Sequence, residues 1–301
     1  MTKSINQHWV PQFYLREFAT PQTKYTANPQ VWIFSKRDED KDERLTSIRN
    51  VCAKRYLYTP RGKNGERSWE VDDDLEGVEA LLGEVWSSIS SGFVDLSKQA
   101  TRKALSLFIA TNHIRHPANL KIVRGIHHNL VRSYDRLPKK PDGTPDVDEF
   151  IFNGKAHKAD TSDWHDYRSW SDDDYHRFFV RRIRREAGLL AKTMLTKRWS
   201  VVIADQPYFI TSDRPVVLQH SERSVFGSTT HGAIISFPLS PTRLLVMDDL
   251  HEEPANQYYP LNPGCSAAFN FSIWHNSSRF MITGRSVPDV LTDIMTWAKQ
   301  A

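Results

Sequence analysis

The stretch that decides the fold is His8-Trp9-Val10-Pro11-Gln12-Phe13-Tyr14-Leu15-Arg16-Glu17-Phe18, close to the N-terminus. It holds four aromatic side chains, a histidine, an arginine and a glutamate in eleven positions. Pro11 fixes its own φ and lacks a backbone donor, and the apolar spacing after it predicts a short helix with one buried face. A terminus this rich in aromatic residues is expected to pack into the core. His8 and Arg16 would then be held on a rigid element.

The composition limits which kinds of protein and which kinds of site are expected. With 301 residues, 39% hydrophobic and 25% charged, the chain is long enough for a substantial core. Its net charge of +4 permits nucleic-acid binding but does not indicate it. Cys52 and Cys265 form no CxxC pair, so neither a thiol zinc site nor a redox motif is visible. Because there is no secretory h-region and no run of 18 apolar residues, we expect a cytoplasmic protein without a membrane span.

Apolar periodicity predicts helices over most of the first two-thirds of the chain. The segment 104–110 is apolar nearly all round, which indicates a buried helix. Residues 72–74 are predicted to cap the helix that follows them and to supply negative charge that favours its dipole, and 137–171 is predicted to be a surface insertion. From Trp199 onwards, short apolar runs between turn residues predict strands. We therefore predict one domain over 1–301 of the α+β class, a mostly helical N-terminal two-thirds packed on a small C-terminal antiparallel sheet.

Four segments together resemble the DUF4238 family, a group of mostly bacterial proteins without an assigned function. They are the opening motif His-x-x-Pro-x-Phe-Tyr-Leu-Arg-x-Phe at 8–18, Arg-His-Pro at 115–117, Ile-Thr-Ser-Asp-Arg-Pro at 210–215 and Pro-Leu-Ser-Pro at 238–241. The resemblance covers nearly the whole chain. It also implies that Glu79 lies where the family tends to place a glutamate.

Polar residues in these segments are the candidate site. An arginine on a buried helix needs a carboxylate or an anionic ligand, so Arg115 should have one. Asp213 either forms a turn that holds the chain or directs its carboxylate into a cleft. We predict three catalytic residues: His8, Glu79 and Asp213. We predict four substrate-binding residues: Arg16, Arg115, Ser212 and His116. The alternative is that Glu79, Arg115 and Asp213 form a buried ion-pair network that fixes the fold.

A histidine, carboxylates and arginines that meet would suit hydrolysis of an anionic substrate. The leading hypothesis is a hydrolase or nuclease acting on nucleic acid, a nucleotide or another phosphate-bearing substrate, in bacterial stress or anti-phage defence. Carboxylates with a histidine can also hold a divalent metal, although no compact metal motif, P-loop or GxSxG is present. The basic run 181–198 is either a solvated helix face or a phosphate-binding face. The alternative hypothesis is a non-catalytic binding or sensor module that uses the Trp-rich segment 164–170.

Overall fold

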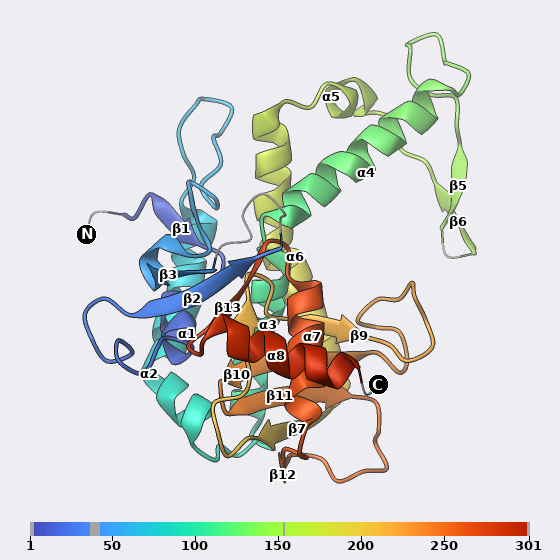
Figure 1. Ribbon diagram of the computed structural model, residues 1–301. Helices are drawn as coiled ribbons and strands as arrows, with labels where there is room; N and C mark the ends of the chain where they lie inside the picture. The colour runs from blue at the N-terminus through green and yellow to red at the C-terminus, as the bar shows by residue number, and fades with distance from the viewer. Residues whose placement is uncertain (1–2, 37–42, 153, 300–301) are drawn as a thin grey trace.

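The computed structural model describes residues 3–36, 43–152 and 154–299, which form an α+β fold (Figure 1). The helices in these ranges are α1 (Gln12–Glu17), α2 (Glu70–Ser91), α3 (Gln99–Ile114), α4 (Ala118–Asp135), α5 (Trp164–Arg168), α6 (Asp172–Thr196), α7 (Cys265–Asn276) and α8 (Val287–Ala298). The strands are β1 (Asn6–His8), β2 (Gln30–Ser35), β3 (Glu43–Ser47), β4 (Ala53–Arg55), β5 (Glu149–Phe152), β6 (Lys155–Lys158), β7 (Arg198–Ile203), β8 (Thr211–Ser212), β9 (Val217–Gln219), β10 (Ile234–Ser240), β11 (Arg243–Asp248), β12 (Gln257–Pro260) and β13 (Phe280–Thr283). None of these helices combines the length and the apolar composition needed to cross a membrane.

Strands from distant parts of the chain form two main sheets. The four-stranded sheet has the order β3-β2-β13-β8, with every neighbouring pair antiparallel. The five-stranded sheet has the order β12-β7-β11-β10-β9, in which β12 runs parallel to β7 and the other pairs are antiparallel. Two further pairs, β1–β4 and β5–β6, stand apart from these sheets.

The predicted arrangement, a mostly helical N-terminal two-thirds packed on a small C-terminal antiparallel sheet, is wrong. The apolar run at 31–34 does form a strand, but that strand lies inside the four-stranded sheet, where Ile33 pairs with Ile282. The five-stranded sheet is mixed rather than antiparallel. The composition of a segment indicates a strand, whereas the partner of that strand depends on packing against residues far away in the chain.

The N-terminal stretch lies at the centre of the core, as predicted. The ring of Tyr14 on α1 packs 5.8 Å from Trp86 of α2 and 5.1 Å from Phe237 of β10. Phe108 of α3 contacts both of those rings as well. The Tyr14 hydroxyl is hydrogen-bonded to Thr211 Oγ1 at 2.7 Å, which links α1 to the four-stranded sheet. One buried aromatic cluster therefore joins three helices and both main sheets, and it fixes the orientation of the residues just before α1.

Residues 118–168, here called the arm, project from the body of the molecule (Figure 1). The arm consists of α4, the hairpin β5–β6 and α5, so it contains most of the predicted surface insertion 137–171. Its base is packed on α6, because His127 is hydrogen-bonded to the Tyr175 hydroxyl at 2.8 Å and stacked on Trp170. Trp164 is buried and stacks on Tyr134. The aromatic residues at 164–170 thus pack inwards and do not form the exposed contact surface of the alternative hypothesis.

Candidate functional site

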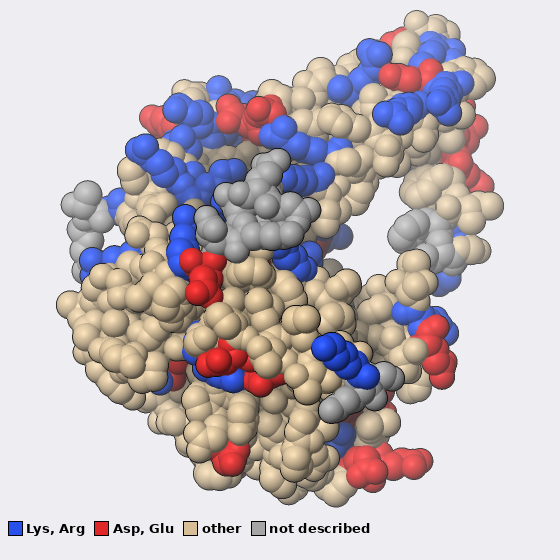
Figure 2. All heavy atoms as spheres, in the orientation of Figure 1, with Lys and Arg blue, Asp and Glu red and all other residues tan. Residues whose placement is uncertain are grey.

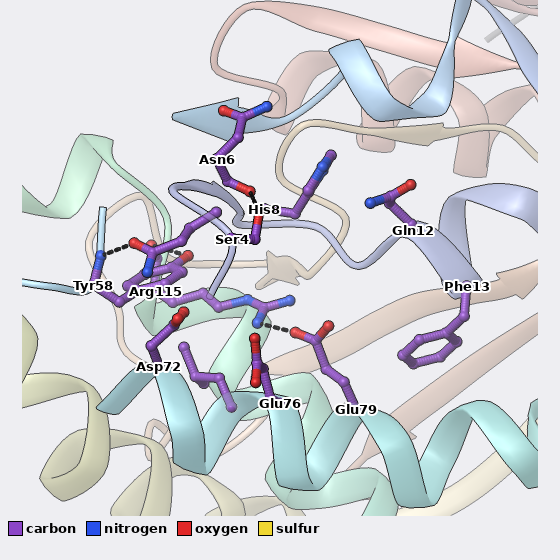
Figure 3. A pocket seen from close by; sticks show the side chains of 12 residues that line it. Ser4, Asn6, His8, Gln12, Phe13, Tyr58, Asp72, Glu76, Glu79 and Arg115 are labelled. Atoms are coloured by element: carbon purple, nitrogen blue, oxygen red, sulfur yellow. Dashed lines mark hydrogen bonds and ion pairs between the residues drawn. The ribbon is translucent and has the colours of Figure 1, made fainter. Parts of the chain in front are cut away.

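A cavity of about 310 Å³, here called the α2 pocket, opens between the N-terminal strand and one face of α2 (Figure 3). Its lining residues are Ser4, Asn6, Gln7, His8, Gln12, Phe13, Tyr58, Asp72, Leu75, Glu76, Glu79 and Arg115. Figure 3 shows His8 and Gln12 on one side of the cavity and Glu76 and Glu79 on the other. The pocket therefore surrounds one space with carboxylates, an imidazole, amides and a guanidinium.

The carboxylates of the pocket come from one face of α2. Asp72, Glu76 and Glu79 are spaced four and three residues apart, which places them in a row along the helix. The helix begins at Glu70, with Trp69 as its N-cap, so the predicted capping by residues 72–74 is wrong. Asp72 lies instead in the first helical turn, where the helix dipole favours a negative charge.

Arg115 is buried at the floor of the pocket and is held on three sides. Its Nε donates to the carbonyl oxygen of Trp9 at 2.9 Å. Its Nη1 donates to Glu79 Oε1 at 2.6 Å, and its Nη2 donates to Asn112 Oδ1 at 3.3 Å. The carboxylate partner predicted for Arg115 is thereby confirmed. A guanidinium has five N–H donors, so two remain beyond these three bonds for a ligand in the pocket.

Asp72 is a carboxyl group that holds its proton unusually well. Burial raises the pKa of Asp72 to about 6; the nearby Gln7 side chain opposes the rise, and the charges of Glu76 and Asp73 add to it. Close to pH 6 the carboxyl group is thus divided between its protonated and ionised forms. A group that titrates so near neutrality is suited to donate a proton in a reaction.

The pKa of His8 is shifted in the opposite direction, to lower values. Burial lowers its pKa, the hydrogen bond to Val51 opposes the change, and the positive charge of Arg115 adds to it. His8 Nδ1 lies 3.1 Å from the carbonyl oxygen of Val51, which can only accept, so Nδ1 carries the hydrogen. The neutral imidazole therefore keeps its lone pair on Nε2, the arrangement of a general base.

A second polar cluster, around His116 and Asp213, is buried and does not line the pocket. His116 Nε2 lies 3.9 Å from Asp213 Oδ2, and burial lowers the pKa of His116 while Asp213 opposes the change. Asp213 Oδ1 accepts a hydrogen bond from the Ser278 backbone at 2.9 Å. His116 Nδ1 accepts one from the Ala118 backbone at 3.0 Å. These bonds hold the chain segments of the cluster together.

Trp9 connects this cluster to the α2 pocket. Its indole Nε1 donates to the carbonyl oxygen of Asp213 at 3.1 Å, and its own carbonyl oxygen accepts from Arg115. Ser212, the neighbour of Asp213 in the chain, is fully buried. Its hydroxyl oxygen accepts a hydrogen bond from the Arg214 backbone at 3.1 Å. The segment at 212–213 thus supports the floor of the pocket from behind.

Arg16 lies outside both the α2 pocket and the buried cluster. Its Nη1 donates to the carbonyl oxygens of Lys24 and Thr26, at 3.0 and 3.2 Å, which fastens the loop after α1. Of the predicted site residues, the structure brings together three in the α2 pocket: His8, Glu79 and Arg115. It places three in the buried cluster: His116, Ser212 and Asp213. The prediction missed Asp72, although the acidic residues repeat along α2 at spacings that mark one helix face.

The sequence suggested that carboxylates and a histidine could hold a divalent metal. In the described ranges, no group of three or more His, Cys, Asp or Glu side chains lies close enough to hold a metal ion. The two cysteines are far apart and both are free thiols, with Cys52 buried and Cys265 exposed.

Comparison with known proteins identifies one family. A family model described as "Protein of unknown function (DUF4238)" matches residues 6–286 and so spans both polar clusters. No curated protein matches the chain, and no solved structure does.

Proposed function

The chain belongs to the DUF4238 family, whose function is unassigned, and on that premise we propose that it is a ribonuclease that cleaves RNA phosphodiester bonds in the α2 pocket. One observation carries the proposal. Around a buried arginine in a single cavity, a carboxyl group has its pKa raised to about 6 and an imidazole has its pKa lowered. Two titratable groups whose pKa values are shifted in opposite directions can supply the acid and the base of a reaction.

Arg115 is the group that would bind the phosphate. Guanidinium groups bind phosphate oxygens through paired N–H donors, and two donors of Arg115 are not used by Trp9, Glu79 or Asn112. The ion pair with Glu79 makes Glu79 a positioning residue, because it fixes the plane of the guanidinium. The neighbouring carboxylates favour a phosphodiester, with one negative charge, over a doubly charged phosphate monoester. A cavity of about 310 Å³ is at the small end of ligand pockets, which suits one phosphate with its sugar.

RNA is the favoured polymer because it brings its own nucleophile. In the proposed reaction His8 Nε2 takes the proton of the ribose 2′-hydroxyl while the O2′–P bond forms. The P–O5′ bond breaks, and Asp72 gives its proton to the leaving O5′. Arg115 stabilises the charge that develops on the phosphoryl oxygens. In Figure 3 the guanidinium of Arg115 ends beside Glu79, with Asp72 on the same side of the cavity and His8 on the opposite side. The products are a 2′,3′-cyclic phosphate and a free 5′-hydroxyl.

The expected setting follows from the same proposal. Both cysteines are free thiols, which suits the reducing cytoplasm, and RNA cleavage would suit a role in bacterial stress or anti-phage defence. The second candidate function is a binding or sensor module that holds a phosphate in the pocket without cleaving it. It is favoured by the two N–H donors of Arg115 that Trp9, Glu79 and Asn112 leave unused, because these donors can hold a phosphate without any acid or base.

The test uses a single-stranded RNA, the DNA of the same sequence, and a chelator to remove metal ions. We expect cleavage of the RNA alone, with 2′,3′-cyclic phosphate ends detected by mass spectrometry. His8→Ala and Asp72→Asn should each lower the rate by about 10²–10⁴-fold. Glu84→Gln is the matched control, because Glu84 is exposed on α2 and lies outside the pocket. Binding of RNA without cleavage would favour the sensor module, and neither binding nor cleavage would contradict both functions.

A further inference from the structure

The arm carries an apolar stripe on the outside of α4. Ile122, Ile126 and Leu130 are 50%, 53% and 42% exposed. They are spaced four residues apart, so they share one helix face over about 12 Å. Ile151 on the hairpin is exposed to 79%. Single exposed apolar residues are common, but a continuous stripe marks an interaction surface.

The hairpin of the arm joins neither of the two main sheets. Among the described residues, β5 and β6 pair only with each other, and the side chains of β6 are all exposed. Figure 1 shows the hairpin standing clear of both main sheets, and Figure 2 shows an opening between it and the body. A two-stranded hairpin on its own is marginally stable in water unless a further strand or a helix packs on it. The hairpin is therefore suited to pack on another molecule.

Two consecutive segments of the arm, here called the basic half and the acidic half, carry opposite net charges, while residues 150–168 hold three Lys or Arg and three Asp. Residues 118–140 hold six Lys or Arg and one Asp, a net charge of +5. Residues 141–149 hold three Asp, one Glu and no Lys or Arg, a net charge of −4. In the part of the chain that the structure describes, the ion pairs of the arm use Arg124, Asp135, Lys139 and Arg168 and leave the acidic half out. A nucleic acid or an anionic membrane would be attracted by one half and repelled by the other.

We propose that the arm binds the arm of a second copy of this chain. A surface with one basic and one acidic half is complementary to itself after a two-fold rotation, the symmetry of most homodimers. In this dimer the hairpin of each copy covers the apolar stripe of the other. The basic half 118–140 of one copy lies along the acidic half 141–149 of its partner.

The test reverses the charges of each half in the full chain. The first variant is Lys121→Glu, Arg132→Glu and Arg136→Glu, and the second is Asp146→Lys, Asp148→Lys and Glu149→Lys. All six side chains are exposed. We expect the unaltered chain to have twice its 34.8 kDa mass in light-scattering measurements, and each variant to have the single mass. Mixing the two variants should restore the doubled mass, because each reversed half then meets its complement.

A control variant carries the same change of charge on the body: Lys103→Glu, Arg181→Glu and Lys192→Glu, at exposed positions of α3 and α6. It should remain a dimer. Circular dichroism of every variant shows whether it is folded. The proposal is overturned if the unaltered chain is monomeric, if either arm variant stays dimeric, or if the mixture fails to pair. A monomer whose arm binds anionic lipid vesicles would also overturn it, in favour of a membrane surface.

Discussion

Arg115 and Glu79 join the end of α3 to the middle of α2 through an ion pair of 2.6 Å at the floor of the α2 pocket. The arginine side chain is 1% exposed and the glutamate side chain 28%, so the pair is sheltered from solvent on one side and faces the pocket on the other. The carbonyl oxygen of Trp9 ties the same guanidinium to the N-terminal stretch. One side chain thus links three segments of the fold and also presents donors to the cavity.

The first prediction concerns the stability that this pair provides. Glu79→Ala leaves a buried guanidinium without its carboxylate, which should lower the free energy of unfolding by about 3 kcal/mol. The matched control is Asp73→Ala, which removes an exposed ion pair with Lys3 from the same helix and should cost less than about 1 kcal/mol. Urea denaturation measures both. An equal, small loss in the two variants would mean that Arg115 does not depend on Glu79.

The second prediction uses the protonation of Asp72. Its pKa in the folded protein is raised to about 6, so folding favours the protonated carboxyl and the ionised form costs stability. The cost grows as the pH rises from about 4 to 6 and persists above that range. Asp72→Asn should therefore stabilise the protein, by about 1–2 kcal/mol at pH 7.5 after allowance for solvent screening, and by less at pH 5. Denaturation at the two pH values tests this, and an equal gain at both would contradict the raised pKa.

The third prediction is the pH dependence of RNA cleavage. The reactive form needs His8 neutral and Asp72 protonated. Because the pKa of His8 is lowered and that of Asp72 is raised to about 6, the rate should fall above about pH 6 and also at acid pH, below the pKa of His8. Rates measured from pH 4 to 8 should follow this bell. A rate that keeps rising above pH 7 would remove Asp72 from the role of acid.

Features that depend on residues close together in the chain could be predicted from the sequence. Pro11 and the apolar spacing after it mark α1 locally, and that helix is present. The cost of burying a charge required a partner for Arg115, and Glu79 is that partner. What the sequence did not reveal depends on distant packing. The pairing of β2 with β13 brings Ile33 and Ile282, about 250 positions apart in the chain, into one buried core. Asp213 does not line the pocket, and its carbonyl oxygen accepts a hydrogen bond from the Trp9 indole instead.

The last prediction concerns Asp213, which the sequence placed among the catalytic residues. The side chain is buried, and its carboxylate accepts from the Ser278 backbone just before β13. Asp213→Ala removes this part-buried, charge-assisted hydrogen bond and should lower the free energy of unfolding by about 1–3 kcal/mol. Asp213→Asn keeps an oxygen acceptor and should cost less.

Since Asp213 does not line the α2 pocket, folded molecules of both variants should keep the unaltered rate of RNA cleavage. Asp205→Ala, at an exposed turn, is the control and should change stability by less than about 0.5 kcal/mol. A folded Asp213→Asn variant that binds RNA but cleaves it about 100-fold more slowly would return Asp213 to the catalytic residues.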